Sequence, residues 1–331
     1  MKAQKQSKTA SRNKGRSWFF VRLSRIMVSI IGLMLVGAIY ESLAEAADAK
    51  TYPPPGQLVD VGGHRLHINC TGAGSPTVVI EAGLGDWSTS WGGYVQPEVA
   101  KTTRVCTYDR AGLGWSEASP LPGDAAQFSQ ELHTLLQNAN VPGPYVMVGH
   151  SLGGLVVHVF AHDYASEVIG VVLIDSMNPK QVTQSLSKSL ARRLYVQAAL
   201  ARVGVARLLV KLPAIAPSMP DNEEAYYPLY IRPQSLQTTA KEYQSLPASA
   251  AEAGAVRSFG DLPLIVLTAG LNDNPGWPEW QAELLQLSSR SQHLFAKNSG
   301  HTIQFDEPDA AVAAILEMVQ QVRETGIKQG L

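Results

Sequence analysis

Residues 145–161 constrain the fold of this chain more than any other segment. Residues 145–148 form a short apolar run with β-branched and aromatic side chains, which predicts a buried strand. Residues 155–161 are apolar enough for a buried helix. Little more than the pentapeptide Gly149-His150-Ser151-Leu152-Gly153 separates the two. A strand that turns this directly into a helix forces the turn residue into a strained backbone conformation, and the flanking glycines leave room for the close approach.

Ser151 is the residue at the apex of this predicted turn. It is held out there where a base can reach it, with the start of a helix behind it. Gly-x-Ser-x-Gly between a strand and a helix is typical of the nucleophile elbow of serine hydrolases. The alternative is a turn without chemistry, because short small-residue patterns also arise by chance. A reactive serine would further require a base, an acid that orients the base, and an oxyanion hole.

The N-terminus has the layout of an export signal. Residues 1–25 carry eight basic side chains and no acidic one, and residues 26–40 form an uncharged apolar run. Small-residue patterns suited to a signal peptidase follow at residues 44–46 and 47–49. We expect residues 1–50 to place the protein outside the cytoplasm (periplasmic or extracellular), as a cleaved signal or as a membrane anchor through residues 18–40. The run is shorter than a usual span of ~20 residues, so a buried core helix is the remaining alternative.

Composition narrows the function classes. The chain has 331 residues, of which 45% are hydrophobic and 17% charged, as expected for one large α/β domain with or without an insert. Outside residues 1–25 there are 19 basic residues against 28 acidic ones, so nothing in the charge suggests nucleic-acid binding. A proline-rich spacer at residues 51–56 precedes the folded domain, which we expect to begin near Gln57.

Strand and helix patterns alternate through the rest of the chain. Strand patterns occur at residues 58–61, 65–70, 76–81, 103–108, 145–148, 168–175, 262–268 and 293–296, and helical patterns at 125–138, 155–161, 280–288 and 308–322. This alternation predicts an α/β fold with a mostly parallel, eight-stranded sheet and helices on both faces. Residues 176–258 interrupt it with amphipathic helical sequence. We therefore predict a core of residues 57–175 and 259–331, with a helical cap inserted after the sixth strand.

Three motifs, in this order, resemble the α/β-hydrolase family over roughly residues 57–325. They are Tyr-Asp-Arg-Ala-Gly-Leu-Gly-Trp-Ser at residues 108–116, Gly-His-Ser-Leu-Gly-Gly at residues 149–154, and Ser-Gly-His at residues 299–301. The resemblance implies a serine hydrolase without a metal or organic cofactor, and a triad in the chain order Ser, Asp, His. A serine at the elbow argues against the family's dehalogenases and epoxide hydrolases, which use a carboxylate nucleophile.

His301 is the leading candidate for the base. It lies in a predicted loop before the last helix, where the resemblance places the family's histidine, and a loop side chain can reach Ser151. The alternative is a surface histidine near a helix start. The other histidines are expected on the hairpin surface (His64, His67), within the elbow (His150), in packing or surface positions (His158, His162), or without functional context (His133, His293). No metal site is expected, because no third ligand accompanies a histidine pair.

The orienting acid has two candidates. Asp273 follows the predicted strand at residues 262–268, and its separation of 28 residues from His301 is similar to the usual arrangement in the family. Asp175 ends the preceding strand, where some family members place the acid instead. Both lie at the carboxyl edge of the sheet, where the loops of an open α/β sheet form the site. The sequence favours Asp273, and either carboxylate could simply cap a loop.

The oxyanion hole requires two backbone N–H donors. The resemblance assigns these to the amides of Leu152, at the helix start, and Leu84, in the loop after the third strand. Many family members have His-Gly where this chain has Ala82-Gly83, which leaves the geometry of that loop open.

Two further pairs of residues are expected to be structural. Asp109 and Arg110 are interpreted as an ion pair or capping set rather than as chemistry. Cys70 and Cys106 are the only cysteines. In the fold that the resemblance implies, their strands are antiparallel neighbours, so an exported protein would favour a disulfide between them over two buried thiols.

The sequence thus predicts a carboxylesterase that forms an acyl-enzyme. Tyr226, Tyr227 and Tyr230 in the cap suggest an apolar acyl or aryl group in a small-molecule ester substrate. Hydrolysis of a lactone, a peptide or a carbon–carbon bond would use the same triad. A non-catalytic ligand receptor or scaffold on this fold is the alternative from another class, although such a protein has no need of a complete triad.

Overall fold

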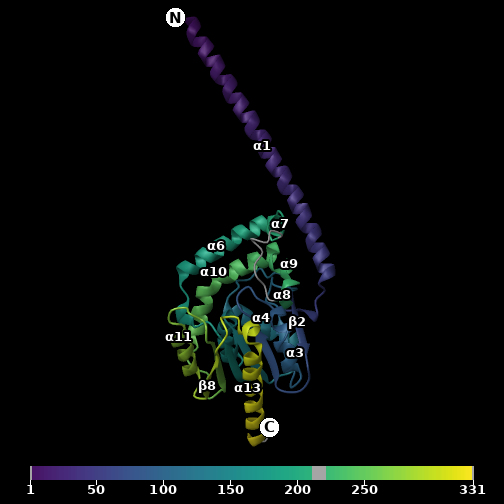
Figure 1. The fold of residues 1–331 in the computed structure, drawn as a ribbon, viewed down its shortest axis with the longest axis vertical. Helices are drawn as coiled ribbons and strands as arrows, with labels where there is room; N and C mark the ends of the chain where they lie inside the picture. Colours follow the sequence, from purple (N-terminus) through teal and green to yellow (C-terminus); the bar gives the residue numbers. More distant parts are fainter. Residues whose placement is uncertain (1, 211–220, 330–331) are drawn as a thin grey trace.

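The structure is a computed structural model that describes residues 2–210 and 221–329. Its centre is one eight-stranded sheet in the order β1-β2-β4-β3-β5-β6-β7-β8 (Figure 1). The strands are β1 (Gln57–Asp60), β2 (Arg65–Thr71), β3 (Thr77–Glu81), β4 (Val105–Tyr108), β5 (Tyr145–His150), β6 (Val168–Ile174), β7 (Leu264–Ala269) and β8 (Ser291–Ala296). Strand β2 is antiparallel to both β1 and β4, and the remaining pairs are parallel. The predicted fold class is confirmed.

Helices cover both faces of this sheet. Helices α3 and α13 pack on one face, and α4, α5 and α11 pack on the other. The core helices are α2 (Thr89–Gly92), α3 (Val95–Ala100), α4 (Ala125–Asn138), α5 (Leu152–Asp163), α11 (Trp277–Leu284), α12 (Ile303–Asp306) and α13 (Pro308–Gln329), with 3-10 turns at Pro179–Gln181 and Leu285–Leu287. Because β5 is covered on both sides, all six of its residues are buried, as expected for a central parallel strand.

A helical layer lies between β6 and β7 in the chain. It consists of α6 (Gln184–Ala201), α7 (Val205–Leu209), α8 (Asp221–Glu224), α9 (Tyr227–Tyr230) and α10 (Pro233–Ala255). Helix α6 packs along α10, and α10 packs in turn on α4 and α5 of the core. We call α6–α10 the cap. Part of the segment predicted as a cap, residues 211–220, lies outside the described residues.

Helix α1 (Lys2–Thr51) extends away from the folded body at the end formed by α6 and α7 (Figure 1). The stretch Trp18–Thr51 is long and apolar enough to cross a membrane, judged by length and composition. Its last turns contact the cap, where Arg207 forms ion pairs with Glu41 at 2.9 Å and Asp48 at 2.7 Å. After a short connection, β1 begins at Gln57.

A disulfide joins Cys70 in β2 to Cys106 in β4. The two residues are directly opposite each other in the antiparallel register of these strands. The predicted disulfide is therefore present, and it closes a loop with a sequence separation of 36 residues.

The expected surface position of His64 and His67 is wrong, since both are buried. His64 lies 3.2 Å from Glu131 of α4. His67 accepts a hydrogen bond at Nε2 from the Gly56 amide, so its Nδ1 proton donates to Asp109 at 3.0 Å. The hairpin pattern could not reveal this burial, because His67 lies in β2, an interior strand of the sheet, and His64 in the turn before it packs against α4.

Candidate active site

The turn between β5 and α5 places Ser151 at the carboxyl edge of the sheet. Ser151 has φ = 51° and ψ = −119°, a strained conformation for a residue with a side chain. A Cβ atom at Gly149 would lie 2.7 Å from the carbonyl oxygen of Gly153. One at Gly153 would collide with the Glu81 carbonyl of β3. The glycines are thus required by close backbone packing on both sides of the serine.

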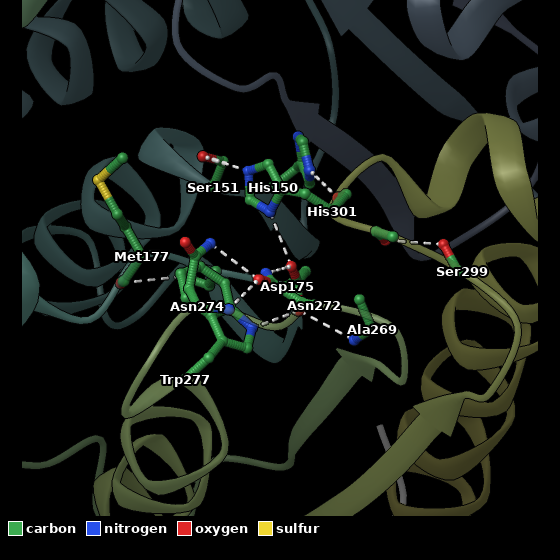
Figure 2. A network of polar contacts seen from close by, with 12 residues as sticks. His150, Ser151, Asp175, Met177, Ala269, Asn272, Asn274, Trp277, Ser299 and His301 are labelled. Atoms are coloured by element: carbon green, nitrogen blue, oxygen red, sulfur yellow. Dashed lines mark hydrogen bonds and ion pairs between the residues drawn. The ribbon is translucent and has the colours of Figure 1, made fainter.

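Three side chains at this edge form a continuous hydrogen-bonded chain (Figure 2). His301, in the loop between β8 and α12, has its Nε2 3.0 Å from Ser151 Oγ and its Nδ1 2.7 Å from Asp175 Oδ2. An ionised carboxylate can only accept, so Nδ1 carries a proton and Nε2 is free to accept the serine hydroxyl proton. The three residues follow β5, β8 and β6, whose parallel carboxyl ends meet at one edge.

His301 therefore pairs with Asp175, and the preference for Asp273 is corrected. Asp175 is fully buried directly after β6, with a left-handed φ of 39°. Asp273 is exposed in the loop after β7. The loop that carries Asp273 contributes a hydrogen-bond donor to Asp175: Asn272 Nδ2 donates to Asp175 Oδ2 at 3.0 Å. Sequence separation from the histidine could not distinguish two acids that follow adjacent parallel strands.

Two further donors fix the other carboxylate oxygen. The Ala269 amide and Trp277 Nε1 donate to Asp175 Oδ1 at 2.9 and 2.8 Å. With Asn272 and His301, four donors satisfy one buried carboxylate, which compensates its loss of hydration. The sequence did not predict that Trp277 and Asn272 bind this carboxylate, because it showed only that they lie in or near the loop after a strand.

His150 holds the loop that carries His301. Its Nε2 donates to the main-chain oxygen of His301 at 2.9 Å. Burial and the neighbouring His301 lower the pKa of His150 to about 3, so it stays neutral at any working pH. The expected structural role of this residue inside the elbow agrees with these contacts.

The loop after β3 passes close to the elbow. A Cβ atom at Gly83 would lie 2.8 Å from His150 Nδ1 and 3.4 Å from Ser151 Cβ. Leu84, next in the chain, is partly buried and lines the same cavity as Ser151. Leu152 begins α5 immediately after the serine. The two amides expected to hold an oxyanion therefore belong to two segments that both lie next to Ser151.

Arg110 supports this loop, and the expected pair with Asp109 is not formed. The guanidinium is paired at 2.7 Å with both Glu81 of β3 and Glu242 of α10. It also donates to the main-chain oxygens of Ala82 and Gly83. Burial alone would lower the pKa of Arg110, but the two carboxylates outweigh burial and raise it.

Asp109 instead organises the segment after β4. It accepts hydrogen bonds from the amides of Ser88 and Trp115 and from His67. The interpretation of Asp109 as a capping residue holds, while the partner of Arg110 in the cap, 132 residues further along the chain, was not foreseeable from local sequence.

A cavity of about 910 Å³ opens over the serine and the histidine. It lies between the loop after β3, the cap and the segment 301–306, and its apolar lining includes Leu84, Met177, Tyr227, Tyr243 and Phe305. No group of His, Cys, Asp and Glu side chains suited to hold a metal ion is found within residues 2–210 and 221–329.

Two acidic side chains that line this cavity were missed by the sequence analysis. Glu223 of the cap accepts hydrogen bonds from Thr89 and Tyr230, both at 2.8 Å, and Tyr230 also reaches Asp86 at 3.2 Å. Burial raises the pKa of Glu223 to about 7 and that of Asp86 to about 6. These acids tie the cap to the core below it.

Comparison with known proteins places the fold. Residues 66–315 match the model of the Alpha/beta hydrolase family. The uncharacterized protein YqjL of Bacillus subtilis is 28% identical over 257 residues, which cover 75% of this chain and 85% of that protein. An uncharacterized protein of Schizosaccharomyces pombe is 28% identical over 288 residues, but this chain covers 52% of its length.

Solved structures agree with the family match. An esterase from Thermogutta terrifontis is similar with a TM-score of 0.61 and 20% identity, over 80% of this chain and 98% of that one. The crystal structure of a putative lipase from Acinetobacter baumannii gives a TM-score of 0.65 and 20% identity, over 85% and 97% of the two chains. Identities this low establish the fold alone. With its family model matched over residues 66–315, this chain belongs to the alpha/beta hydrolase family.

Proposed function

We propose that this protein is a serine carboxylesterase whose triad is Ser151, His301 and Asp175. The observation that carries the proposal is the pair of hydrogen bonds at His301, 3.0 Å to the serine and 2.7 Å to the acid. A nucleophile, a base and an orienting carboxylate in this order are the constellation of serine acyl transfer.

The reaction proceeds through an acyl-enzyme. Ser151 Oγ attacks the ester carbonyl carbon while its proton passes to His301 Nε2. The carbonyl oxygen becomes an oxyanion, and the amides of Leu84 and Leu152 stabilise it. His301 then protonates the leaving alcohol. Between these two proton transfers His301 is an imidazolium, which Asp175 stabilises. Water, deprotonated by His301, attacks the acyl-enzyme and releases the acid and the free serine.

The cavity supports an ester with an apolar acyl or aryl group. Leu84, Met177 and Phe305 line the cavity over the serine together with cap tyrosines. At neutral pH the raised pKa of Glu223 leaves a large part of that side chain uncharged, which reduces the charge that an apolar substrate must approach.

Turnover of a short p-nitrophenyl ester tests the function. Ser151→Ala should reduce the rate to background, while Ser258→Ala, on an exposed loop serine, should leave it unchanged. Equal rates in the two variants would contradict the proposal. Saturable binding of the ester without turnover by the native protein would favour a receptor instead.

We also propose the membrane topology of the chain. The basic residues 1–25 stay in the cytoplasm, α1 crosses the membrane, and the catalytic domain lies outside. The disulfide between Cys70 and Cys106 supports this placement, because such bonds persist in oxidising compartments.

A further inference from the structure

The C-terminal part of α1 is built into the cap. Arg207 of α7 is 7% exposed and pairs with Glu41, which is 3% exposed. Cleavage at residues 44–46 would remove Glu41 and keep Asp48, whereas cleavage at residues 47–49 would remove both partners of the guanidinium. Either cut removes at least one carboxylate partner of a buried guanidinium, which is unfavourable. These contacts favour a helix that is retained rather than removed.

The cap meets α1 near the end of the uncharged apolar run 26–40. A Cβ atom at Gly37 would collide with the main-chain oxygen of Val203, and one at Gly204 would lie 2.9 Å from the Tyr40 ring. Gly37 and Tyr40 fall in the last four residues of the uncharged apolar run 26–40. The point where this run ends is where a spanning helix leaves the hydrocarbon. With α1 spanning a membrane, residues 203–204 would be level with the edge of the bilayer.

The side of the cap that faces this level carries several exposed apolar side chains with no partner in the described chain. We define the outer cap face as Leu186, Arg193, Val196 and Leu200 of α6 with Leu208 and Leu209 of α7. The apolar members are 39–61% exposed. In α6 these four residues recur at spacings of 7, 3 and 4, which places them on one side of the helix.

The opposite side of α6 packs against α10. Its buried residues, Ser187, Ala191, Ala198 and Ala201, are small and face inward. The helix carries Lys188, Arg192 and Arg193 and no acidic residue. Exposed apolar residues on a helix whose charged residues are all basic are typical of a helix that lies in the headgroup region of a membrane.

We propose that the outer cap face rests on the lipid bilayer that α1 spans. Figure 1 shows α6 and α7 at the end of the body from which α1 extends, as this placement requires. This placement also suggests the substrate class, an inference that rests on the proposed esterase function. The substrate would be an ester dissolved in the same bilayer, because a cap that lies on the membrane can admit such an ester to the active site.

The contact is tested with the full-length protein in vesicles. Leu200→Cys is labelled with an environment-sensitive fluorophore and reconstituted in vesicles that contain acidic lipids and lipids brominated on their acyl chains. The native cysteines are both in the disulfide, so one site is labelled. Ser289→Cys, at the amino edge of the sheet before β8, is the matched exposed control.

Emission from position 200 should shift to shorter wavelength and be quenched by brominated lipid, while position 289 should show neither change. Equal behaviour at the two positions would overturn the proposal. This fluorescence measurement does not depend on catalysis, so its result tests the membrane contact independently of the esterase function.

A second measurement addresses the substrate. In the double variant Val196→Asp, Leu200→Asp, the ratio of turnover of a long-chain ester in the vesicles to turnover of a short soluble ester should fall about tenfold or more, since two apolar contacts with lipid are lost. An unchanged ratio would refute delivery from the bilayer. Absence of turnover of both esters by the native protein would instead refute the esterase function.

Discussion

Replacing Asp175 by asparagine should change the tautomer of His301. Oδ1 accepts from the Ala269 amide and Trp277 Nε1, so the amide oxygen of the new side chain should take that position. The amide nitrogen then occupies the place of Oδ2, 2.7 Å from His301 Nδ1. Because an amide nitrogen donates, Nδ1 must accept, and the ring proton moves to Nε2. Nε2 can no longer take the proton of Ser151.

The expected loss is large. A wrong tautomer in an otherwise intact triad lowers kcat by about 10⁴, which corresponds to ~5.5 kcal/mol of transition-state stabilisation. We expect kcat/KM for a p-nitrophenyl ester to fall by about 10³–10⁴ in Asp175→Asn, with little change in KM. The melting temperature of the variant checks that the fold is kept.

Asp273→Asn is the matched control. Its side chain is exposed, so its kcat/KM should stay within about twofold of the native value. A small loss at position 175 together with a large loss at position 273 would refute the assignment of the acid. A large loss in both would mean that the loop after β7 must be rigid for another reason.

Three other predictions concern stability. Arg110→Met leaves Glu81 and Glu242 buried without their partner and should lower the free energy of unfolding by about 3–5 kcal/mol in urea titrations; Arg65→Met, at an exposed pair, should change it little, and equal effects would contradict this. Reduction of the disulfide should lower the same free energy by about 4 kcal/mol for its loop length; an unchanged urea midpoint would refute it. Because the folded-state pKa of Glu223 is raised to about 7 from its ordinary value of 4.5, its protonated form favours the folded state. That contribution is fully present below pH 4.5 and is lost as the pH rises through 7. The melting temperature of Glu223→Gln should therefore fall less between pH 5 and pH 8 than that of the native protein. An equal fall in the two proteins would contradict this.

The elbow and the base could be predicted because their signals are local. A strand, a turn and a helix that follow one another within residues 145–161 dictate where Ser151 lies, and the Ser299-Gly300-His301 motif places the histidine at the same edge. Such constraints need only the chain's immediate neighbourhood and the alternation of strands and helices.

The acid and the support of the oxyanion loop depend on distant contacts. Asp175 and Asp273 both follow parallel strands, and what separates them is a set of donors from residues 269–277. Arg110 reaches Glu242 of the cap across 132 residues. The burial of His67 depends likewise on the strands on either side of it. Local sequence has no access to these pairings.

The most direct test of the central claim is to map the serine that becomes acylated. The protein is treated with a fluorophosphonate probe, digested, and the modified peptide is sequenced by mass spectrometry. We predict one adduct, on Ser151, whose rate of formation falls to background in His301→Gln. An adduct on another serine, or labelling of Ser151 at an undiminished rate without His301, would contradict the proposed triad.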